Sequence, residues 1–221
     1  MTTNNQPNQF KPKIRLPMKI ICIGRNYVAH AKELNNEVPG EPVIFMKPDS
    51  ALLRNNDPFY IPDWTQDVHH EIELIVRINR LGKNIEKKFA HRYYDEIGIG
   101  IDFTARDIQN ALKDKGLPWE KSKAFDYSAV ICPEFVSVSS LPDRNAINFR
   151  LDINGKTVQE GNSSLMIFPI DEIISQVSKY FTLKIGDLIY TGTPAGVGPV
   201  KIGDHLKGYL EGDKKFDFFV K

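Results

Sequence analysis

Short apolar runs alternate with polar connections along most of this chain, a pattern typical of a protein built mainly from short strands. An Asn154-Gly155 pair separates two of the runs and predicts a hairpin with a tight two-residue turn. In chain order, strands are predicted over residues 18–24, 43–46, 71–78, 97–103, 147–153, 156–160, 187–191, 205–210 and 216–220.

Four segments have helical periodicity instead: residues 27–34, 85–95, 105–115 and 170–181. The third is predicted to end at Gly116, since glycine adopts the left-handed conformation that often terminates a helix. Strands and helices do not alternate strictly, and no repeat is visible. The pattern therefore favours a β-rich α+β fold over a doubly wound parallel sheet.

One predicted strand carries two glutamates, Glu71 and Glu73, on the same face, because side chains alternate along a strand. Like charges at this spacing repel unless a cation lies between them, and a hard divalent ion bound by oxygen ligands meets that need. Asp102 interrupts another apolar strand, where a carboxylate requires a partner. The alternative is a pair of solvated charges on an edge strand. We interpret the three acids as a candidate Mg²⁺ or Mn²⁺ site, with His69 as a fourth ligand or a polar neighbour.

Composition narrows the class of protein. The 221 residues are 41% hydrophobic with a net charge of +1 and no basic stripe, so nucleic acid is not an expected partner. No apolar run reaches the length of a membrane span, and no secretory signal is visible. Cys22 and Cys132 lie in apolar surroundings, which predicts a reducing, cytoplasmic location but leaves a disulfide open. Polar residues 1–17 are predicted to form a flexible tail, and residues 18–221 a single catalytic domain.

Several motifs occur together and in a fixed order: Gly24-Arg25-Asn26-Tyr27, His30-x-x-Glu33, Lys47-Pro48, His70-Glu71-x-Glu73-Leu74, Asp102-x-Thr104-Ala105-Arg106-Asp107, Lys115-Gly116-x-Pro118-Trp119-x-x-x-Lys123-x-Phe125-Asp126, and the Gly-rich segment 191–199. Jointly they resemble the fumarylacetoacetate hydrolase family, above all its acylpyruvate hydrolase and oxaloacetate decarboxylase branch. The resemblance implies a β-roll with short helices, a homodimer, and Mg²⁺ or Mn²⁺ held by Glu71, Glu73 and Asp102.

The same resemblance implies roles for residues that the pattern alone leaves ambiguous. His30 and Glu33 would form a dyad that activates water, although a His and a Glu three apart on a helix are often only a surface pair. The helix that carries them, with the Asn/Pro/Gly stretch after it, would belong to a lid. Lys123 would contact the substrate, although a lysine in such a sequence is ordinarily solvated.

Further residues are candidates for substrate binding. Arg106 and Gln109 are three apart on one helix and suit recognition of a distal oxygen, although Arg106 could instead pair with Asp107. In the Gly-rich segment, backbone N–H groups and the Thr193 hydroxyl could contact a substrate carboxylate. Two more candidates lie in the first loop, where they could line the pocket or only anchor the loop: Arg25 and Tyr27.

These features predict a metal-dependent enzyme for a small 2-oxo acid. Three carboxylates leave a divalent ion with open positions for the carboxylate and 2-oxo oxygens of a pyruvate-like substrate. The cation would stabilise a pyruvate enolate, so one site could hydrolyse 3-acylpyruvates and decarboxylate oxaloacetate. Two alternatives are isomerisation or decarboxylation of hydroxymuconate-type dicarboxylates and a non-catalytic cation-binding protein. The His30/Glu33 pair argues against the latter.

Overall fold

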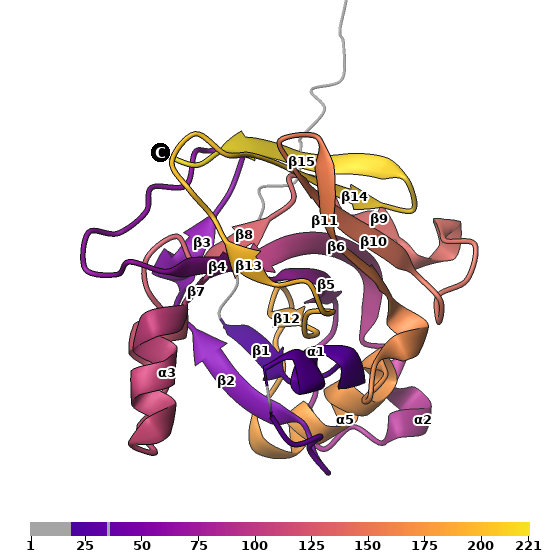
Figure 1. Ribbon diagram of the computed structural model, residues 1–221. Helices are drawn as coiled ribbons and strands as arrows, with labels where there is room; N and C mark the ends of the chain where they lie inside the picture. The colour runs from indigo at the N-terminus through magenta and orange to yellow at the C-terminus, as the bar shows by residue number, and fades with distance from the viewer. Residues whose placement is uncertain (1–18, 35) are drawn as a thin grey trace, which may run out of the picture.

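The computed structural model describes residues 19–34 and 36–221, so the predicted tail over residues 1–17 lies outside the described part of the chain. Its main element is an eight-stranded mixed sheet in the order β2-β1-β12-β5-β6-β8-β3, with β9 paired to β6 (Figure 1). The strands of this sheet are β1 (Ile20–Gly24), β2 (Val43–Lys47), β3 (Leu52–Leu53), β5 (Ile72–Ile78), β6 (Tyr94–Asp102), β8 (Ala129–Ile131), β9 (Val136–Ser137) and β12 (Leu188–Tyr190).

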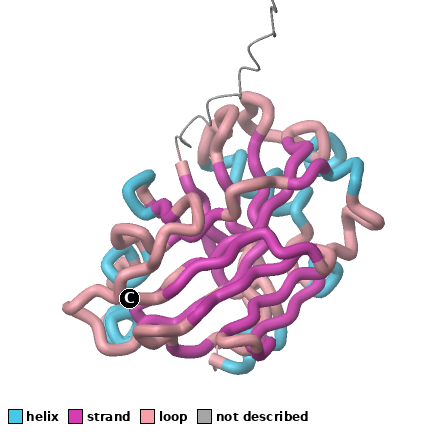
Figure 2. The backbone as a smooth tube through the Cα atoms, turned by 90° about the horizontal axis from the view of Figure 1, so that it is seen from above, coloured by secondary structure: helices cyan, strands magenta, loops and turns pink. Residues whose placement is uncertain are grey.

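Two smaller sheets complete the strand framework. A four-stranded sheet has the order β11-β10-β14-β15, and a three-stranded sheet has the order β13-β4-β7. In Figure 2 the strands fill the centre of the molecule and the helices lie around them, which confirms the β-rich α+β fold. The remaining strands are β4 (Val68–His70), β7 (Thr104–Ala105), β10 (Asn148–Ile153), β11 (Lys156–Asn162), β13 (Gly198–Pro199), β14 (His205–Leu210) and β15 (Asp213–Phe219).

The helices are short and peripheral: α1 (Val28–Glu33), α2 (Lys87–Ala90), α3 (Arg106–Asp114), α4 (Glu120–Lys123) and α5 (Ile170–Tyr180), with single 3-10 turns at Asp49–Ala51, Val138–Ser140 and Ser163–Leu165. Gly116 follows α3 with φ +63°, as its predicted role requires. The hairpin turn is also confirmed, with φ +53° at Asn154 and +79° at Gly155. None of the helices in the described residues is long and apolar enough to cross a membrane.

The predicted helix over residues 85–95 is wrong. Only Lys87–Ala90 is helical, and Tyr94 already pairs with Ile78 at the start of β6. The segment has a competing attachment at each end. Ile85 donates its backbone N–H to the Ser178 hydroxyl of α5, and the aromatic Tyr94 suits a strand position better than a helix. Sheet pairing therefore overrides the local periodicity.

Alternation along β5 divides the core into two clusters. Ile72, Leu74 and Val76 lie in the larger cluster, which also contains the apolar side chains of the four-stranded sheet and α5. Ile75, on the opposite face, packs in a second cluster with Ile20 of β1 and neighbouring apolar residues. Glu73 shares this second face, so its carboxylate lies beside an apolar layer. Both faces of the strand are buried, which excludes the edge-strand alternative.

Candidate metal centre and active site

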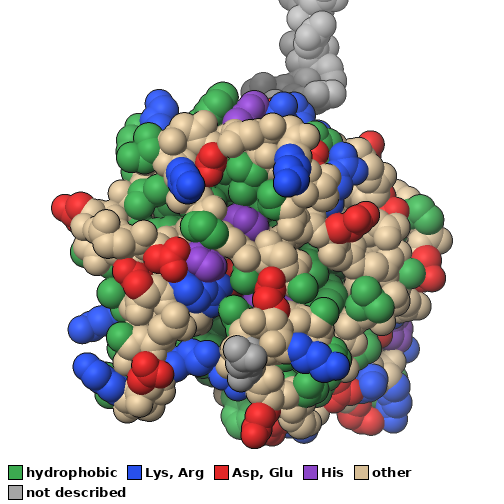
Figure 3. Space-filling model, viewed as in Figure 1, with side chains coloured by type: hydrophobic (Ala, Val, Ile, Leu, Met, Phe, Trp, Pro, Cys, Tyr) green, Lys and Arg blue, Asp and Glu red, His purple; other side chains and the backbone are tan. Residues whose placement is uncertain are grey.

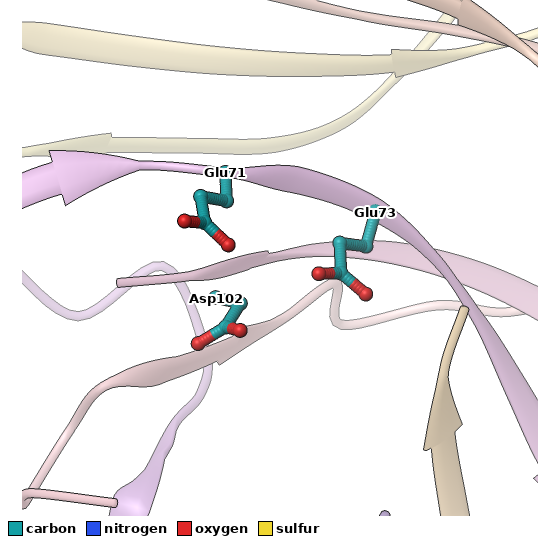
Figure 4. Close-up of side chains that lie close together, drawn as sticks. All are labelled: Glu71, Glu73 and Asp102. Atoms are coloured by element: carbon teal, nitrogen blue, oxygen red, sulfur yellow. The ribbon is translucent and has the colours of Figure 1, made fainter. Parts of the chain in front are cut away.

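Glu71, Glu73 and Asp102 converge on one point. Figure 4 shows the two glutamates extending from the same side of their strand toward Asp102 on the neighbouring strand. One oxygen from each carboxylate lies within 4.8 Å of the others, and all three side chains are buried. Strand pairing produces this convergence, because the Asp102 backbone N–H donates to the Glu71 carbonyl oxygen at 2.9 Å. The predicted cluster of three acids is therefore present.

Buried cations surround two of the three acids. Lys123 Nζ donates to Glu71 Oε2 at 2.7 Å and to Asp102 Oδ2 at 2.8 Å, and it also reaches the Thr104 hydroxyl at 2.6 Å. Lys47 Nζ lies 2.7 Å from Asp102 Oδ1, outside hydrogen-bonding geometry, so this oxygen has no donor in the described structure. Arg106 donates to Glu71. All three N–H groups of Lys123 thus contact protein groups that hold the cluster together.

The protonation behaviour of the two glutamates differs. Burial opposes ionisation of Glu71, but the adjacent Lys123 and Arg106 hold its pKa well below the usual range. Glu73 forms no salt bridge with the described residues, and its Oε2 accepts only the Gly192 N–H, at 2.7 Å. Burial, then the charges of Asp102 and Glu71, raise the pKa of Glu73 well above its usual value. A buried oxygen donor set with one acid lacking a cation fits a hard divalent ion.

The Gly-rich connection after β12 contributes to the site through its backbone. Gly192 has φ +99°, and a Cβ there would lie 2.6 Å from the Cβ of Asn26, so glycine is required for the close approach to β1. The Gly192 N–H holds Glu73, and the Gly196 N–H donates to Glu33 Oε1 at 3.0 Å. These two backbone donors therefore bind protein carboxylates, whereas the sequence suggested that backbone donors of this segment would bind a substrate carboxylate.

His30 and Glu33 form the predicted pair on α1. His30 Nδ1 lies 3.3 Å from Glu33 Oε2, and the His30 side chain is buried while Glu33 is partly exposed. Burial lowers the pKa of His30, and the charge of Glu71 and the hydrogen bond with Glu33 only partly oppose this. The pair is therefore more than a surface contact: it presents an imidazole that is neutral near neutral pH.

One cavity connects these groups. Predicted site residues that line it are Arg25, His30, Glu71, Glu73, Asp102, Arg106, Gln109, Lys123 and Thr193. Glu33 and Tyr27 are not among its lining residues. The Tyr27 hydroxyl is buried without a hydrogen-bond partner in the described structure, and burial together with the charge of Glu73 raises its pKa.

Arg106 joins the cluster of three acids to the rest of the cavity. Besides Glu71 it donates to Gln109 Oε1 at 2.5 Å and to His69 Nδ1 at 3.4 Å. The alternative pairing with Asp107 is wrong, since Asp107 instead accepts hydrogen bonds from Thr65 and from the backbone of Gln66. His69 binds Asp67 through Nε2, so its two ring nitrogens face Arg106 and Asp67 and it is not part of the cluster of acids.

Three buried or half-buried residues near the site were given no role by sequence reasoning, although Lys47 belongs to the Lys47-Pro48 motif. Lys47 ends an apolar strand, a position where a buried charge signals a partner. Lys113 stands seven residues after Arg106 and four after Gln109, so it shares their helical face. Gln159 of β11 had no local signal. Its Oε1 accepts from His70 Nδ1 at 2.8 Å and from the Ile72 N–H at 3.0 Å, on either side of Glu71.

The sequence pattern of the family described as "Fumarylacetoacetate (FAA) hydrolase C-terminal" matches residues 19–216. Oxaloacetate tautomerase FAHD1 of Mus musculus, a mitochondrial protein, is 43% identical over 204 residues, which cover 91% of each chain. A mitochondrial oxaloacetate decarboxylase of Dictyostelium discoideum is 41% identical over 209 residues, which cover 92% of this chain and 94% of the relative. The chain belongs to the fumarylacetoacetate hydrolase family of enzymes.

A solved relative supports the same assignment at the level of the fold. The fumarylpyruvate hydrolase of Pseudomonas aeruginosa, solved in complex with Mn²⁺ and pyruvate, superposes with a TM-score of 0.87 at 33% sequence identity. The match covers 92% of this chain and 89% of that one. The predicted family resemblance and the predicted fold are therefore confirmed, and the non-catalytic alternative is not supported.

Proposed function

We propose that this protein is a Mg²⁺- or Mn²⁺-dependent enzyme that breaks the bond between C3 and C4 of small 2-oxo acids. The reactions are hydrolysis of 3-acylpyruvates and decarboxylation of oxaloacetate, both through the enolate of pyruvate. The observation that carries this proposal is the position of the three buried carboxylates and the His30 imidazole around one cavity. A relative named oxaloacetate decarboxylase and a neighbour named fumarylpyruvate hydrolase support both reactions.

Glu71, Glu73 and Asp102 would hold the metal ion. When bound, the ion supplies electrostatic stabilisation for negative charge that develops on the 2-oxo oxygen of the substrate. Lys123 holds Glu71 and Asp102 in place and Lys47 lies against Asp102, because both ammonium groups are buried beside these acids. Removing one partner of such a buried pair leaves an uncompensated charge at a cost of about 3–5 kcal/mol, so these lysines also fix the shape of the site.

His30 would act as the base in hydrolysis. When Glu33 accepts a hydrogen bond from the Nδ1–H group of His30, the lone pair of the neutral ring lies on Nε2 and can accept a proton from water. The water oxygen then bonds to C4, the bond between C3 and C4 breaks, and its electron pair becomes the enolate of pyruvate. The same imidazole can return the proton to C3. Arg106, Gln109 and Thr193 would orient the substrate.

Tautomerisation of oxaloacetate is a second candidate, favoured by the 43% identity to a protein with that name. The reaction moves a proton between C3 and the 2-oxo oxygen, and a neutral His30 beside the cavity has the chemistry for it. Isomerisation of hydroxymuconate-type dicarboxylates needs the same enolate chemistry and stays an alternative.

A turnover panel tests the proposal. Purified protein with Mg²⁺ or Mn²⁺ is supplied with oxaloacetate, acetylpyruvate and fumarylpyruvate, and pyruvate formation is followed separately from loss of the enol absorbance. We expect metal-dependent pyruvate formation from at least one substrate. Loss of the enol signal without pyruvate would leave only tautomerisation, and no metal-dependent reaction with any of them would overturn the proposal. A homodimer, a small-molecule partner and a reducing compartment are also proposed. Cys22 and Cys132 are both free and buried in the structure, which is compatible with a reducing compartment.

A further inference from the structure

The cavity continues outward from the metal cluster along one face of α3. Arg106, Gln109 and Lys113 are spaced by three and four residues, and all three line the cavity. With a rise of about 1.5 Å per residue, Gln109 lies roughly 4.5 Å and Lys113 roughly 10 Å further along the helix than Arg106. Arg106 donates a hydrogen bond to Glu71, so this face of the helix carries a row of polar side chains that begins at the cluster of acids and ends at Lys113.

Lys113 and Arg25 form the outer end of this series. Lys113 is half-buried, and neither residue forms a salt bridge with the described part of the chain. Burial lowers the pKa of Lys113, and the nearby positive charges of Arg25 and Arg106 lower it further. Three cations thus crowd one end of the cavity. In Figure 3, Lys and Arg side chains gather on the surface between α3 and α1.

The backbone and surroundings of Arg25 hold it in this position. Its φ of +59° is in the left-handed region, which is unfavourable for a residue with a Cβ and tends to persist at functional sites. Its guanidinium lies 5.9 Å from the centre of the Trp119 ring, which also lines the cavity. Across the cavity mouth, Lys113 Nζ donates to Asn36 Oδ1 at 3.0 Å, and among residues 19–34 and 36–221 its other two N–H groups have no acceptor.

The charge balance indicates what that acceptor is. Five positive side chains, Arg25, Lys47, Arg106, Lys113 and Lys123, serve a site with three negative ones, Glu71, Glu73 and Asp102. The inner lysines and Arg106 already contact the acids, so the excess positive charge lies at the outer end. A carboxylate beside Lys113 and Arg25 would offset this local positive charge.

We infer that Lys113 and Arg25 form a subsite for a second, distal carboxylate of the substrate, so that the enzyme prefers 2-oxo acids with an acidic tail. This inference rests on the proposed function for the position of the first carboxylate. The spacing along α3 fits a tail of several carbons, as in fumarylpyruvate, better than the short chain of oxaloacetate.

A matched pair of unreactive ligands tests the subsite without turnover. 2-Oxoheptanedioate and 2-oxoheptanoate differ only in a terminal carboxylate, and neither has the 4-oxo group that hydrolysis needs. Their affinities for the Mn²⁺-loaded protein are measured by isothermal titration calorimetry. We expect the diacid to bind at least about ten-fold more tightly, which is the scale of one charge-assisted hydrogen bond.

The variant Lys113→Met should reduce this preference by about ten-fold, and Lys113→Arg should retain most of it. Lys115→Met is the matched control, because Lys115 is exposed near the end of the same helix and does not line the cavity; it should keep the wild-type preference. Equal affinities of the wild-type protein for the two ligands would overturn the inference, as would an unchanged preference in Lys113→Met.

Failure of the inference is distinguishable from failure of the proposed function. If the wild-type protein cleaves acetylpyruvate and fumarylpyruvate with equal kcat/KM and Lys113→Met affects both equally, the function stands and the subsite is absent. If the protein cleaves nothing but still prefers the diacid in a Lys113-dependent manner, the subsite stands and the proposed reaction is wrong.

Discussion

Gln159 Nε2 donates to the hydroxyl oxygen of Thr193 at 2.9 Å and to the Pro194 carbonyl oxygen at 3.0 Å. The Oε1 of the same side chain accepts from His70 and from the Ile72 backbone, the two neighbours of Glu71. One buried amide therefore fixes the distance between a candidate metal ligand and a candidate substrate-binding loop. It does so without lining the cavity, so its role is positioning.

The two ends of this amide can be tested separately. Gln159→Glu keeps an acceptor for His70 and Ile72 but replaces the donor to Thr193, so we expect metal affinity to hold within a few-fold and KM to rise by about ten-fold. Gln159→Leu should also lower the free energy of unfolding by about 1–3 kcal/mol, because buried polar groups lose their partner. Steady-state kinetics, metal titration and denaturant unfolding measure the three effects. If KM rises but the two variants do not differ in metal affinity or in free energy of unfolding, the two ends of the amide do not act separately.

We expect metal binding to depend strongly on Glu73, although its side chain accepts only one hydrogen bond from the described residues. Glu73→Gln keeps the shape of the side chain and an acceptor for Gly192, but it removes a carboxylate that forms no salt bridge with any described residue. We expect affinity for Mn²⁺ to fall by more than ten-fold, measured by calorimetry, together with loss of any rise in melting temperature on adding metal. Glu96→Gln is the control, since Glu96 is a partly exposed acid of β6 that pairs with Arg77 away from the cluster. Equal effects in both variants would argue against the site.

Local sequence rules identified the cluster of three acids because its determinants are local. Strand alternation places Glu71 and Glu73 on one face, and an acid inside a Gly/Ile run marks Asp102 as partnered. The family resemblance then supplied roles for His30 and Lys123 that their spacing alone left ambiguous. The strand-rich fold followed in the same way, from short apolar runs and one Asn-Gly turn.

The residues that sequence reasoning missed act over long separations. Gln159 is 89 positions from His70, and no periodicity in β11 indicates that its amide points toward β4. Lys47 reaches Asp102 across the sheet, and only its place at the end of an apolar strand hinted at burial. Backbone N–H groups of the Gly-rich segment were expected to contact the substrate, but the fold turns the Gly192 N–H toward Glu73. Helix periodicity over residues 85–95 failed because pairing of Tyr94 with Ile78 outweighs it.

The pH dependence of hydrolysis should reflect the His30 imidazole. A base must be deprotonated, so kcat/KM at saturating metal should fall as pH decreases through the pKa of His30. Because burial lowers this pKa from its ordinary value near 6.5, we expect the acid limb below pH 6.5. The Glu33 hydrogen bond raises the pKa, so Glu33→Gln should move the limb to lower pH still, while Glu37→Gln, at an exposed acid after α1, should not move it. A limb above pH 7, or a shift upward in Glu33→Gln, would assign the titration to another group.

The last prediction separates the two proposed reactions. Hydrolysis needs water activated by His30, whereas decarboxylation of oxaloacetate needs chiefly a bound 2-oxo acid and stabilisation of the enolate charge. Glu33→Ala should therefore lower kcat/KM for acetylpyruvate by about 10²-fold and for oxaloacetate by much less, while Asp102→Ala should abolish both. Glu33 also accepts the Gly196 N–H, so its removal loosens the Gly-rich segment as well. Glu33→Gln retains an acceptor for Gly196 and removes the charge beside His30, which separates the two roles. One outcome would contradict this division: kcat/KM falls equally for both substrates in Glu33→Ala and returns to the wild-type value in Glu33→Gln. The contact with Gly196 would then matter, and activation of water would not depend on the Glu33 charge.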